Sequence, residues 1–489
     1  MPKTTTVIAW CSLTPKKIAS FALGPVLSAL LGLISVPIVA WYFSAEDIGR
    51  ITMLQISMTL AIMMFSMGLD QAYVREYHEE HNKPALLKLT LLPGTILLFV
   101  FCLVLAVWFP FFLSNLLFGI KSALLSFFVI VAIVLSFLTR FLSLIIRMQE
   151  QGWIFSISQL LPKMTFLILI GLYVLGNVDK QFINLLLANV IGMTSVVLLL
   201  FWRTRHELLM AIKQKIELKK LRDVLQYSYP LIIAGLAFWG LSSIDKVLLR
   251  SLSTFEQLGI YSVAVSFAAL GTIFQSVFST VWAPIVYKWA ANNQNLEKVD
   301  EVTEHVLAFV VFVFCAAGLF SWVVSFFLPP QYNSVKYILV ACLSAPLLYT
   351  LSETTVVGIG LTKRMSFAML ASVFAFLVCV LAGYLLIPIY GAAGASVATS
   401  FAFWLFLVMR TEFSSYVWRP LPRVKLYVCS LACVLISALF ALYGEIFGQY
   451  MYGLWAIFAV VFGFVFKKSY IYAWSSLKSF LYIKGKGSA

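Results

Sequence analysis

The chain has 489 residues, of which 62% are hydrophobic and 11% charged, and its formal net charge is +15 with a mean hydropathy of +0.97. A soluble domain carries about 25% charged residues, so this composition excludes a protein with a fully water-exposed surface. In lipid, backbone polar groups must be satisfied within helices or within a closed barrel. The apolar runs here are continuous over about 20 residues and do not alternate with polar residues, which favours helices.

Apolar segments long enough to cross a membrane follow one another along the whole chain. Fourteen can be delimited: 18–43, 51–74, 86–112, 122–147, 153–175, 181–202, 226–250, 258–287, 304–328, 336–361, 365–389, 391–410, 424–444 and 447–466. We therefore predict an all-α integral membrane protein with about 14 transmembrane helices. The first segment is too long for the apolar core of a signal peptide, so we expect it to be retained.

The Lys and Arg residues predict how these spans are oriented. With the N-terminus in the cytoplasm and the spans alternating, 27 of the 35 Lys and Arg fall on the cytoplasmic side and 5 on the outer side. This asymmetry is what the positive-inside rule requires, and it favours an even number of spans with both termini cytoplasmic. The net charge then reflects topology and anionic lipid headgroups, and we expect no nucleic-acid partner.

An internal repeat relates the two halves of the chain at an offset of about 210 residues. The sequence SAEDIG at 44–49 falls on TFEQLG at 254–259, and the first six spans fall on the next six. We predict six-helix bundles at 1–202 and 226–410, and two additional helices with a basic cytoplasmic tail at 411–489. The intervening residues 203–225 alternate lysines with apolar residues at helical spacing, which predicts a cytoplasmic amphipathic linker on the inner surface, with a solvated linker of helical bias as the alternative.

Motifs for catalysis and for cofactor binding are missing from the sequence. It contains no G-x-x-x-x-G-K-[ST] phosphate loop, its four His never have the spacing of metal ligands, and its seven Cys lie in apolar runs or near the N-terminus. We therefore expect no catalytic residue, no metal and no cofactor, and thus no enzyme. The outward connections are short, which disfavours a membrane glycan polymerase or ligase.

One helical stripe in the fourth span carries two cations. Ser136, Arg140, Ser143 and Arg147 recur at spacings of 4, 3 and 4 and therefore share one face. A charge deep in the bilayer is costly and usually faces a wet interior. We favour a stripe that lines a lumen over the alternative of an interfacial anchor, in which an arginine extends to the headgroups.

Lys163 is the best single candidate for a functional cation. It follows Pro162 and lies ten residues from the inner end of its span, or about 15 Å deep at the helical rise. An ammonium group at this depth cannot easily reach the headgroups. The alternative is a structural pair with an acid on another helix.

Two acids, Asp245 and Glu353, are candidates for coupling or gating. Glu353 lies in the tenth span, where burial would favour its neutral form and allow it to bind and release a proton; a polar helix–helix contact is the alternative. Asp245 lies near the outer end of the seventh span beside Lys246, where the alternative is a structural role near the outer interface. Neighbours on a helix point about 100° apart, so we do not expect these two to pair with each other.

The segment GLDQAYVREYHEE, at 68–80, ends the second span with an acid before an arginine. We expect the helix to continue past Arg75, because the next stop signal is Pro84. This places Asp70 in the middle of a helix. We prefer a polar cuff at the cytoplasmic mouth for Asp70 and Arg75, with gating or coupling as the alternative.

Several of these stretches resemble one known group of transporters. SVPIVAWYFSAEDIGRITMLQ and GLDQAYVREYHEE are similar to the first two spans of the polysaccharide transporters of the multidrug/oligosaccharidyl-lipid/polysaccharide (MOP) flippase superfamily. SYPLIIAGLAFWGLSSIDKVLL and YGAAGASVATS resemble their seventh and twelfth spans. The resemblance covers about 18–410 and implies two bundles around a central cavity.

The resemblance also implies a function. It indicates an O-antigen flippase of the bacterial inner membrane, which moves an undecaprenyl-diphosphate-linked oligosaccharide from the inner to the outer leaflet by alternating access. The cationic residues Lys163, Arg140 and Arg147 would neutralise the diphosphate. Implied partners are this lipid-linked oligosaccharide, membrane lipids, H⁺ or Na⁺ as the coupling ion, and glycan polymerase machinery.

Two alternatives belong to the same superfamily. Lipid II flippases carry cations in the first span, whereas 18–43 has none. A multidrug antiporter would use an intramembrane acid for cation coupling, and Asp245 or Glu353 could serve. The GLDQAYVREY and YGAAG motifs favour the polysaccharide branch.

Overall fold

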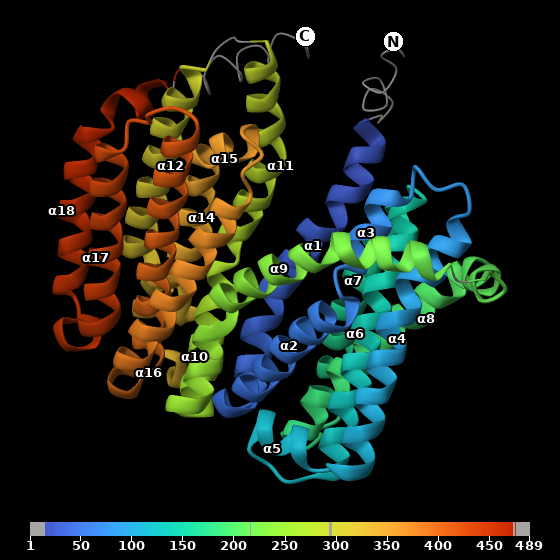
Figure 1. The fold of residues 1–489 in the computed structure, drawn as a ribbon. Coiled ribbons are helices and arrows are strands. Elements are labelled where there is room, and N and C mark those ends of the chain that lie inside the picture. The colour runs from blue at the N-terminus through green and yellow to red at the C-terminus, as the bar shows by residue number, and fades with distance from the viewer. Residues whose placement is uncertain (1–14, 216, 293–295, 473–474, 476–489) are drawn as a thin grey trace, which may run out of the picture. The chain divides into compact units, whose positions relative to one another are not determined.

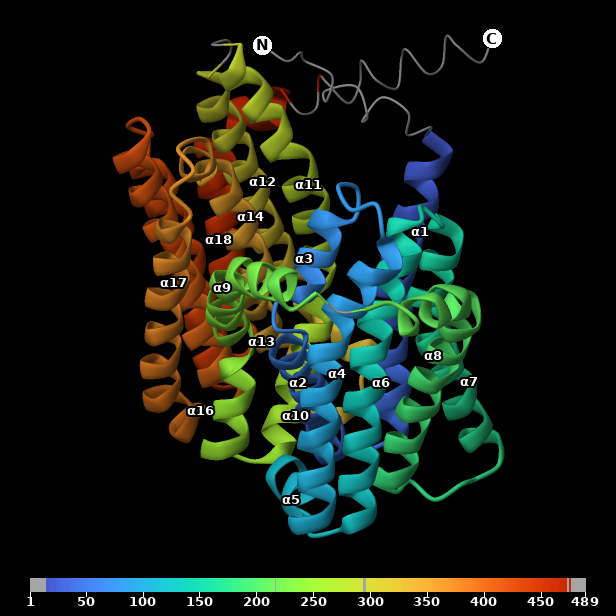
Figure 2. The ribbon, with the colours of Figure 1, turned by 45° about the vertical axis from the view of Figure 1, so that its right-hand side comes forward.

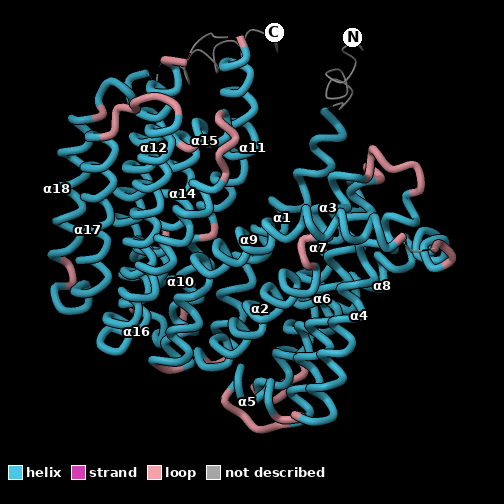
Figure 3. The backbone as a smooth tube through the Cα atoms, in the orientation of Figure 1, coloured by secondary structure: helices cyan, strands magenta, loops and turns pink. Residues whose placement is uncertain are grey.

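The computed structural model describes residues 15–215, 217–292, 296–472 and 475, and that part of the chain is helical almost throughout and contains no strand (Figures 1 and 3). The predicted N-terminal tail and most of the predicted C-terminal tail lie outside the described residues. The chain divides into two compact units, Met1–Leu236 and Ala237–Ala489. The boundary falls inside one long helix, α9 (Leu218–Leu252), eleven residues after the end of the predicted linker.

The helices of the first unit that precede α9 are α1 (Pro15–Tyr42), α2 (Ala45–Ser66), α3 (Leu69–Glu76), α4 (Lys83–Trp108), α5 (Phe112–Phe118), α6 (Ala123–Met148), α7 (Gly152–Leu175) and α8 (Phe182–Ile212). In this unit α1 packs along α7, and α8 packs against α6, α7 and α4 (Figures 1 and 2). One core cluster lies between α3, α4, α6 and α8 and includes Tyr73, Leu86, Ile146 and Leu200. It fixes α6, the helix that carries Arg140 and Arg147.

The helices of the second unit after α9 are α10 (Phe255–Ala268), α11 (Leu270–Ala291), α12 (Lys298–Phe320), η2 (Ser321–Phe326), η3 (Pro330–Tyr332), α13 (Val335–Cys342), α14 (Ser344–Thr355), α15 (Val357–Leu361), α16 (Ser366–Val417), α17 (Val424–Phe447) and α18 (Tyr450–Val465). Here α14 packs against α11, α12 and α16, and α13 packs against α10 and α17. The helices α13 and α14 are the most buried of the unit's membrane-spanning segments.

The fold class predicted from the sequence is confirmed. Eleven helices among the described residues are long and apolar enough to cross a membrane. One of them, α16, has 52 residues and contains two predicted spans, separated at Gly391, where φ is 53° and ψ is −124°. With α9 and the shorter α18, each of the fourteen predicted segments falls on a helix or on a broken helix.

The repeat has a structural counterpart at the start of two helices. Ser44 caps α2, and its hydroxyl accepts a hydrogen bond from the backbone N–H of Asp47 at 3.1 Å. Thr254 caps α10 and accepts in the same way from Gln257 at 3.2 Å. An N-cap hydroxyl satisfies one of the backbone donors that a helix leaves free. The same local signal therefore starts equivalent helices in both halves of the chain.

The end of the second span differs from the prediction. The helix stops at Ser66, because Met67 and Gly68 both adopt left-handed conformations with φ of 51° and 68°, and α3 starts at Leu69. A Cβ atom on Gly68 would lie 3.0 Å from the carbonyl oxygen of Ser228, so α9 also approaches closely here. Asp70 thus lies in the first turn of α3, where the helix dipole favours an acid, and the prediction of a mid-helix position is wrong.

The residues predicted as a separate linker are shared between two helices. The span helix α8 continues to Ile212, and α9 begins at Leu218. The Lys88 ammonium donates to the carbonyls of Ile212 and Gln214 at 2.7 and 2.6 Å and thereby caps the end of α8. Lys220 forms an ion pair with Glu80, and its hydrogen bond holds the pKa of this carboxyl below its usual value. These contacts hold the connection between α8 and α9 against α4 and the loop that precedes it.

Replacing Gly391 tests the break in α16. We expect Gly391→Ala to lower the free energy of unfolding by about 1 to 3 kcal/mol, because the observed φ and ψ are open almost only to glycine. A Cβ atom there would also lie 2.5 Å from the Gln257 side-chain oxygen, which accepts from the Ala392 N–H. The measurement is thermal unfolding of the purified protein in detergent.

Gly453→Ala is the matched control, because Gly453 lies inside α18 and a Cβ atom added there would meet no heavy atom within 4 Å. This change should be neutral or stabilise by up to about 1 kcal/mol. Equal melting temperatures for both variants would contradict the strained turn.

Candidate functional site

The first unit contains an ion pair between two of the predicted residues. Both the Nε and the Nη2 atoms of Arg140 donate to the same Asp70 oxygen, Oδ2, at 3.0 and 2.5 Å. The Asp70 side chain is 7% exposed and that of Arg140 is 35% exposed. A buried carboxylate needs such a partner, since an unpaired charge away from water is costly. The Nη1 group of Arg140 makes no hydrogen bond to any described residue, so it can donate to a further anionic ligand.

The predicted stripe on α6 becomes more exposed toward the end of the helix. Ser136 is buried, Arg140 and Ser143 are half-buried, and Arg147 is exposed in the last turn. The two serine hydroxyls donate to carbonyls of their own helix, those of Ile133 and Arg140. The two arginines are therefore the groups on this face that can bind a ligand.

Lys163 on α7 is held by a neutral partner. Its ammonium donates to the Ser28 carbonyl of α1 at 2.6 Å, and a Cβ atom on Gly32 would lie 2.9 Å from it. No carboxylate of the described residues pairs with Lys163, so the alternative of a structural ion pair is not what the structure shows. No contact joins Lys163 to Arg140 in that part of the chain. An ammonium has three N–H donors, and this one retains capacity for an anion.

Arg75 of α3 is exposed, and its face of the helix is separate from the buried Asp70 that precedes it by five residues. The neighbouring Tyr77 is packed against the Lys83 ammonium, 4.5 Å from the ring centroid. The polar segment 68–80 therefore has a buried part, which binds α6, and an exposed part, which continues into the loop before α4.

The second unit holds a buried Asp245 in a hydrogen-bond cluster. Its Oδ2 atom accepts from the Tyr261 hydroxyl at 2.5 Å and from the Thr399 hydroxyl at 3.3 Å. Its Oδ1 atom accepts from the Lys246 ammonium at 3.2 Å. The prediction that Asp245 and Lys246 do not pair is wrong, because the flexible lysine side chain folds back along α9, where it also reaches the Ser242 carbonyl.

A cavity of about 200 Å³ lies beside this cluster, within the second unit. Its polar lining includes Asp245, Lys246 and Thr399, and apolar side chains such as Phe238 and Phe403 form much of the remainder. A small solute inside the cavity would meet both the lysine and the buried acid, since both line it. Such a volume suits an ion with its water molecules but not a sugar chain.

Glu353 is paired with a residue that the sequence analysis did not select. The Arg410 Nη1 atom donates to the Glu353 carboxylate at 2.8 Å and to the Ser352 hydroxyl at 2.7 Å. Both charged side chains are about nine-tenths buried. The Arg410 guanidinium also lies 5.2 and 4.8 Å from the ring centroids of Tyr349 and Phe406. Arg410 ends the twelfth predicted span, a position where an arginine normally reports the topology. The one signal that could have selected it is that a buried Glu353 needs a cationic partner.

This arrangement suits the binding and release of charged groups. Each unit holds a buried acid against an arginine from another helix, and the first unit adds a lysine with no acid partner among the described residues. The charges are spread over separate helices and do not converge on one reacting atom.

Comparison with known proteins gives the family. The family described as "Polysaccharide biosynthesis protein" matches residues 15–289, more than half of the chain. The chain belongs to this family. The match extends from α1 through α11 and includes Asp70, Arg140, Lys163 and Asp245. No curated protein sequence matches this member of the family.

Solved structures of the same fold are membrane transporters. A structure described as "Lipid II flippase MurJ, inward closed conformation" has a TM-score of 0.67 and 16% identity, covering 92% of this chain and 99% of that one. An inward-facing multidrug resistance MATE family transporter of the MOP superfamily has a TM-score of 0.56 and 13% identity, covering 79% and 94%. The Vibrio cholerae MATE transporter VcmN has a TM-score of 0.54 and 14% identity, covering 81% and 95%. This polysaccharide biosynthesis protein therefore has the fold of MOP superfamily transporters.

The ion pair between Asp70 and Arg140 can be tested by a double-mutant cycle. We expect Arg140→Gln to destabilise the protein by about 1 to 3 kcal/mol, because it leaves a buried carboxylate without its charged partner. Asp70→Asn should cost less, since it removes the buried charge itself. The double variant should be more stable than the sum of the two single effects predicts. Unfolding in detergent measures the cycle, and strictly additive effects would show that the pair contributes no coupling.

Proposed function

We propose that this protein is a flippase for an undecaprenyl-diphosphate-linked oligosaccharide of the O-antigen type. It would move this substrate from the inner to the outer leaflet of the bacterial inner membrane by alternating access, with both termini in the cytoplasm. The observation that carries the proposal is the pair of cations, Arg140 and Lys163, which retain hydrogen-bond donors within the apolar bundle of the first unit. The family match to polysaccharide biosynthesis supports the substrate class.

A diphosphate suits these cations chemically. Charge-assisted hydrogen bonds from guanidinium and ammonium groups are among the strongest that side chains make with phosphate oxygens. In a lipid environment a bound diphosphate lowers the free-energy cost of burying the cation, and the cation lowers the cost of burying the diphosphate. Arg147, which is exposed at the end of α6, would meet the headgroup first, and Arg140 and Lys163 would bind it deeper.

Asp70 would make binding of the diphosphate reversible. Its carboxylate occupies two of the three Arg140 nitrogens, so a diphosphate that binds fully must compete with it. After release of the substrate, Asp70 restores the neutral pair. Since Asp70 lies two residues after the break at Gly68, loss of the pair would also free α3 from α6. In this way Asp70 and Arg75 on α3 would act in gating.

The ion pairs of the second unit suit coupling to an ion gradient. Protonation of Glu353 would release Arg410, and protonation of Asp245 would release Lys246. The first event would break a contact between α14 and α16. The second would break a contact within α9 and change the carboxyl group that Tyr261 of α10 and Thr399 of α16 bind. A sodium ion that binds at either carboxylate would act on the same contacts. The coupling ion is thus H⁺ or Na⁺ in this proposal.

Lipid II is the second candidate substrate, and the solved flippase with this fold transports it by its description. A charge-free stretch from 18 to 43 within α1 favours the O-antigen type, since the first span here offers lipid II no cation. A multidrug antiporter is less consistent with cations as the prominent polar groups of the first unit. The product, delivered to the outer leaflet, would be used by glycan polymerase machinery.

Replacing Lys163 tests the substrate-binding step. We expect Lys163→Ala to abolish surface glycan in a flippase-null strain, because the diphosphate loses its deepest cation, whereas Lys163→Arg should retain a large part of it. Surface glycan is measured by electrophoresis of extracted polysaccharide, with the membrane level of each variant measured in parallel.

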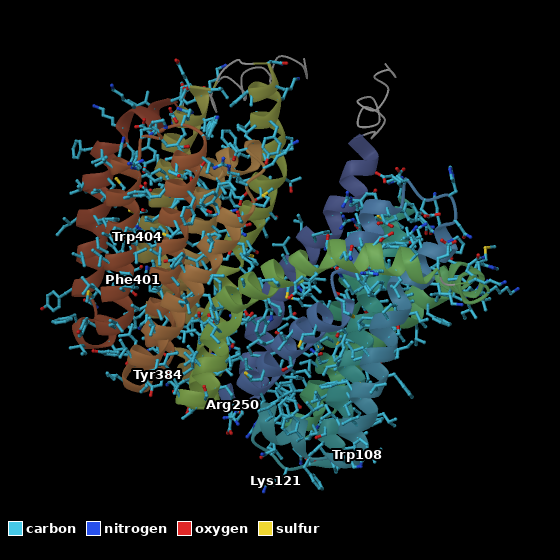
Figure 4. The ribbon with its side chains drawn as sticks, in the orientation of Figure 1. Trp108, Lys121, Arg250, Tyr384, Phe401 and Trp404 are labelled. Atoms are coloured by element: carbon cyan, nitrogen blue, oxygen red, sulfur yellow. The ribbon has the colours of Figure 1, made fainter. Side chains whose placement is uncertain are left out.

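Lys121→Ala provides the matched control for charge. Lys121 lies in the loop before α6, at the same end of the first unit as the exposed Trp108 (Figure 4). Its loss should leave surface glycan unchanged. Full complementation by both Lys163→Ala and Arg140→Ala would contradict the proposed cationic site.

Coupling is tested separately in vesicles. We expect Glu353→Gln or Asp245→Asn to make transport independent of the imposed gradient, because the replaced acid can no longer exchange its ion. Transport of a labelled lipid-linked oligosaccharide is measured with and without an ionophore. Wild-type transport that persists after the gradient collapses would contradict ion coupling while leaving the flippase proposal intact.

A further inference from the structure

The last part of α8, from Trp202 to Ile212, carries a basic and apolar surface that the transport proposal does not use. The helix has 31 residues and is about 46 Å long at the helical rise, whereas a hydrocarbon core is about 30 Å thick. Trp202 lies 20 residues after the first residue, Phe182, and so about 30 Å along the axis. Trp202 therefore marks the interface, and the residues from Arg203 onward lie at the level of the headgroups.

The outward face of this extension combines exposed apolar and basic side chains. An exposed stripe at spacings of 7, 4 and 7 runs from Ile191 through Leu198 and Trp202 to Leu209. It continues the lipid-facing surface of the span past the interface. Arg203, Arg205, His206 and Lys213 lie beside it and are all exposed.

The arginines are arranged around one indole ring. The Arg203 and Arg205 guanidinium carbons lie 5.8 and 5.6 Å from the centroid of Trp202, whose side chain is 58% exposed. Cation–π contacts hold both guanidinium groups near the same indole ring and leave their N–H groups available to donate to an anion. Neither arginine pairs with a carboxylate of the described residues.

The single acid of this segment faces the other way. Between 201 and 215 the sequence contains one acid, Glu207, and its carboxylate accepts from the Gln149 side chain at 2.6 Å. Thr204 and Ala211 are buried on the same inward side. The outward face therefore has positive charges without negative ones. Exposure of Leu209 and Met210 beside these charges is unfavourable in water but favourable at a lipid surface.

We propose that this face, formed by Trp202, Arg203, Arg205 and Leu209, is a binding site for the headgroup of an anionic phospholipid. The lipid phosphate lies between the two arginines, the indole ring and Leu209 contact the upper acyl chain, and Lys213 adds positive potential. The site anchors the end of α8 at the membrane surface. It is independent of the transported substrate, because none of its residues belongs to the proposed transport site.

Native mass spectrometry of the full-length protein in detergent tests the site. The probes are phosphatidylglycerol, phosphatidylcholine and inorganic phosphate. We expect the wild type to bind phosphatidylglycerol in preference to phosphatidylcholine, and Arg203→Gln/Arg205→Gln to weaken binding of the first lipid about 10- to 30-fold, from the loss of two charges near an anionic surface. Arg203→Lys/Arg205→Lys should keep most of the affinity. Lys467→Gln/Lys468→Gln, which removes two exposed charges elsewhere, is the matched control and should bind as the wild type.

A second measurement locates the lipid. Brominated phosphatidylglycerol quenches nearby indoles, and the difference between wild type and Trp202→Phe reports Trp202 alone. Quenching of Trp202 by this lipid, stronger than by brominated phosphatidylcholine, supports the site. Equal binding of both lipids, equal loss in the Lys467/Lys468 control, or competition by inorganic phosphate at lipid concentrations would each overturn it, the last by showing a site for free anions.

Discussion

A carboxylate that leaves water must find a positive partner, and this constraint determines which helices are joined within each of the two units. In the first unit Asp70 of α3 binds Arg140 of α6, and in the second Glu353 of α14 binds Arg410 of α16. Replacement of a buried pair by apolar residues is often neutral or stabilising, so stability alone does not explain why these charges are present. In the proposed transport cycle the helices that they join would separate, because a charge pair can be opened by a competing ion or a proton. Lys163 differs from these charged residues, because its partner is a neutral carbonyl and not a group of opposite charge. This is why it stands out as a site for an anion.

The repeat supplies the scaffold but not the chemistry. Equivalent caps at Ser44 and Thr254 start equivalent helices, which shows that local signals are shared between the halves. The charges are not shared. Arg140 corresponds to Thr350, which is buried and bonded to a carbonyl of its own helix. Each half therefore has its own set of ion pairs on a common framework, with Lys163 in the first unit and the small cavity beside Asp245 in the second.

The fold could be predicted because long apolar runs leave a chain in lipid few alternatives to helices. Even the break in α16 was placed correctly, between 389 and 391, since Pro388 and Gly391 mark it. The break before α3 was not, although Gly68 is a residue that often ends a helix, because Met67 before it is a good helix former and gives no sign of its left-handed conformation. The charged residues could be found one by one, as costly groups inside spans. Their pairing could not, because it depends on packing: Arg410 was counted as a topology marker, and the reach of the Lys246 side chain overrode the angle between neighbours on α9.

In the proposed cycle an anionic substrate competes with Asp70 for Arg140. The most direct measurement is the affinity of the purified protein for a polyprenyl-diphosphate-linked oligosaccharide, compared among wild type, Asp70→Asn and Arg140→Gln. Removing the internal competitor should make Asp70→Asn bind more tightly than the wild type, and Arg140→Gln should bind more weakly. Unchanged affinity in both variants would contradict the claim and would leave the pair as a structural contact between α3 and α6.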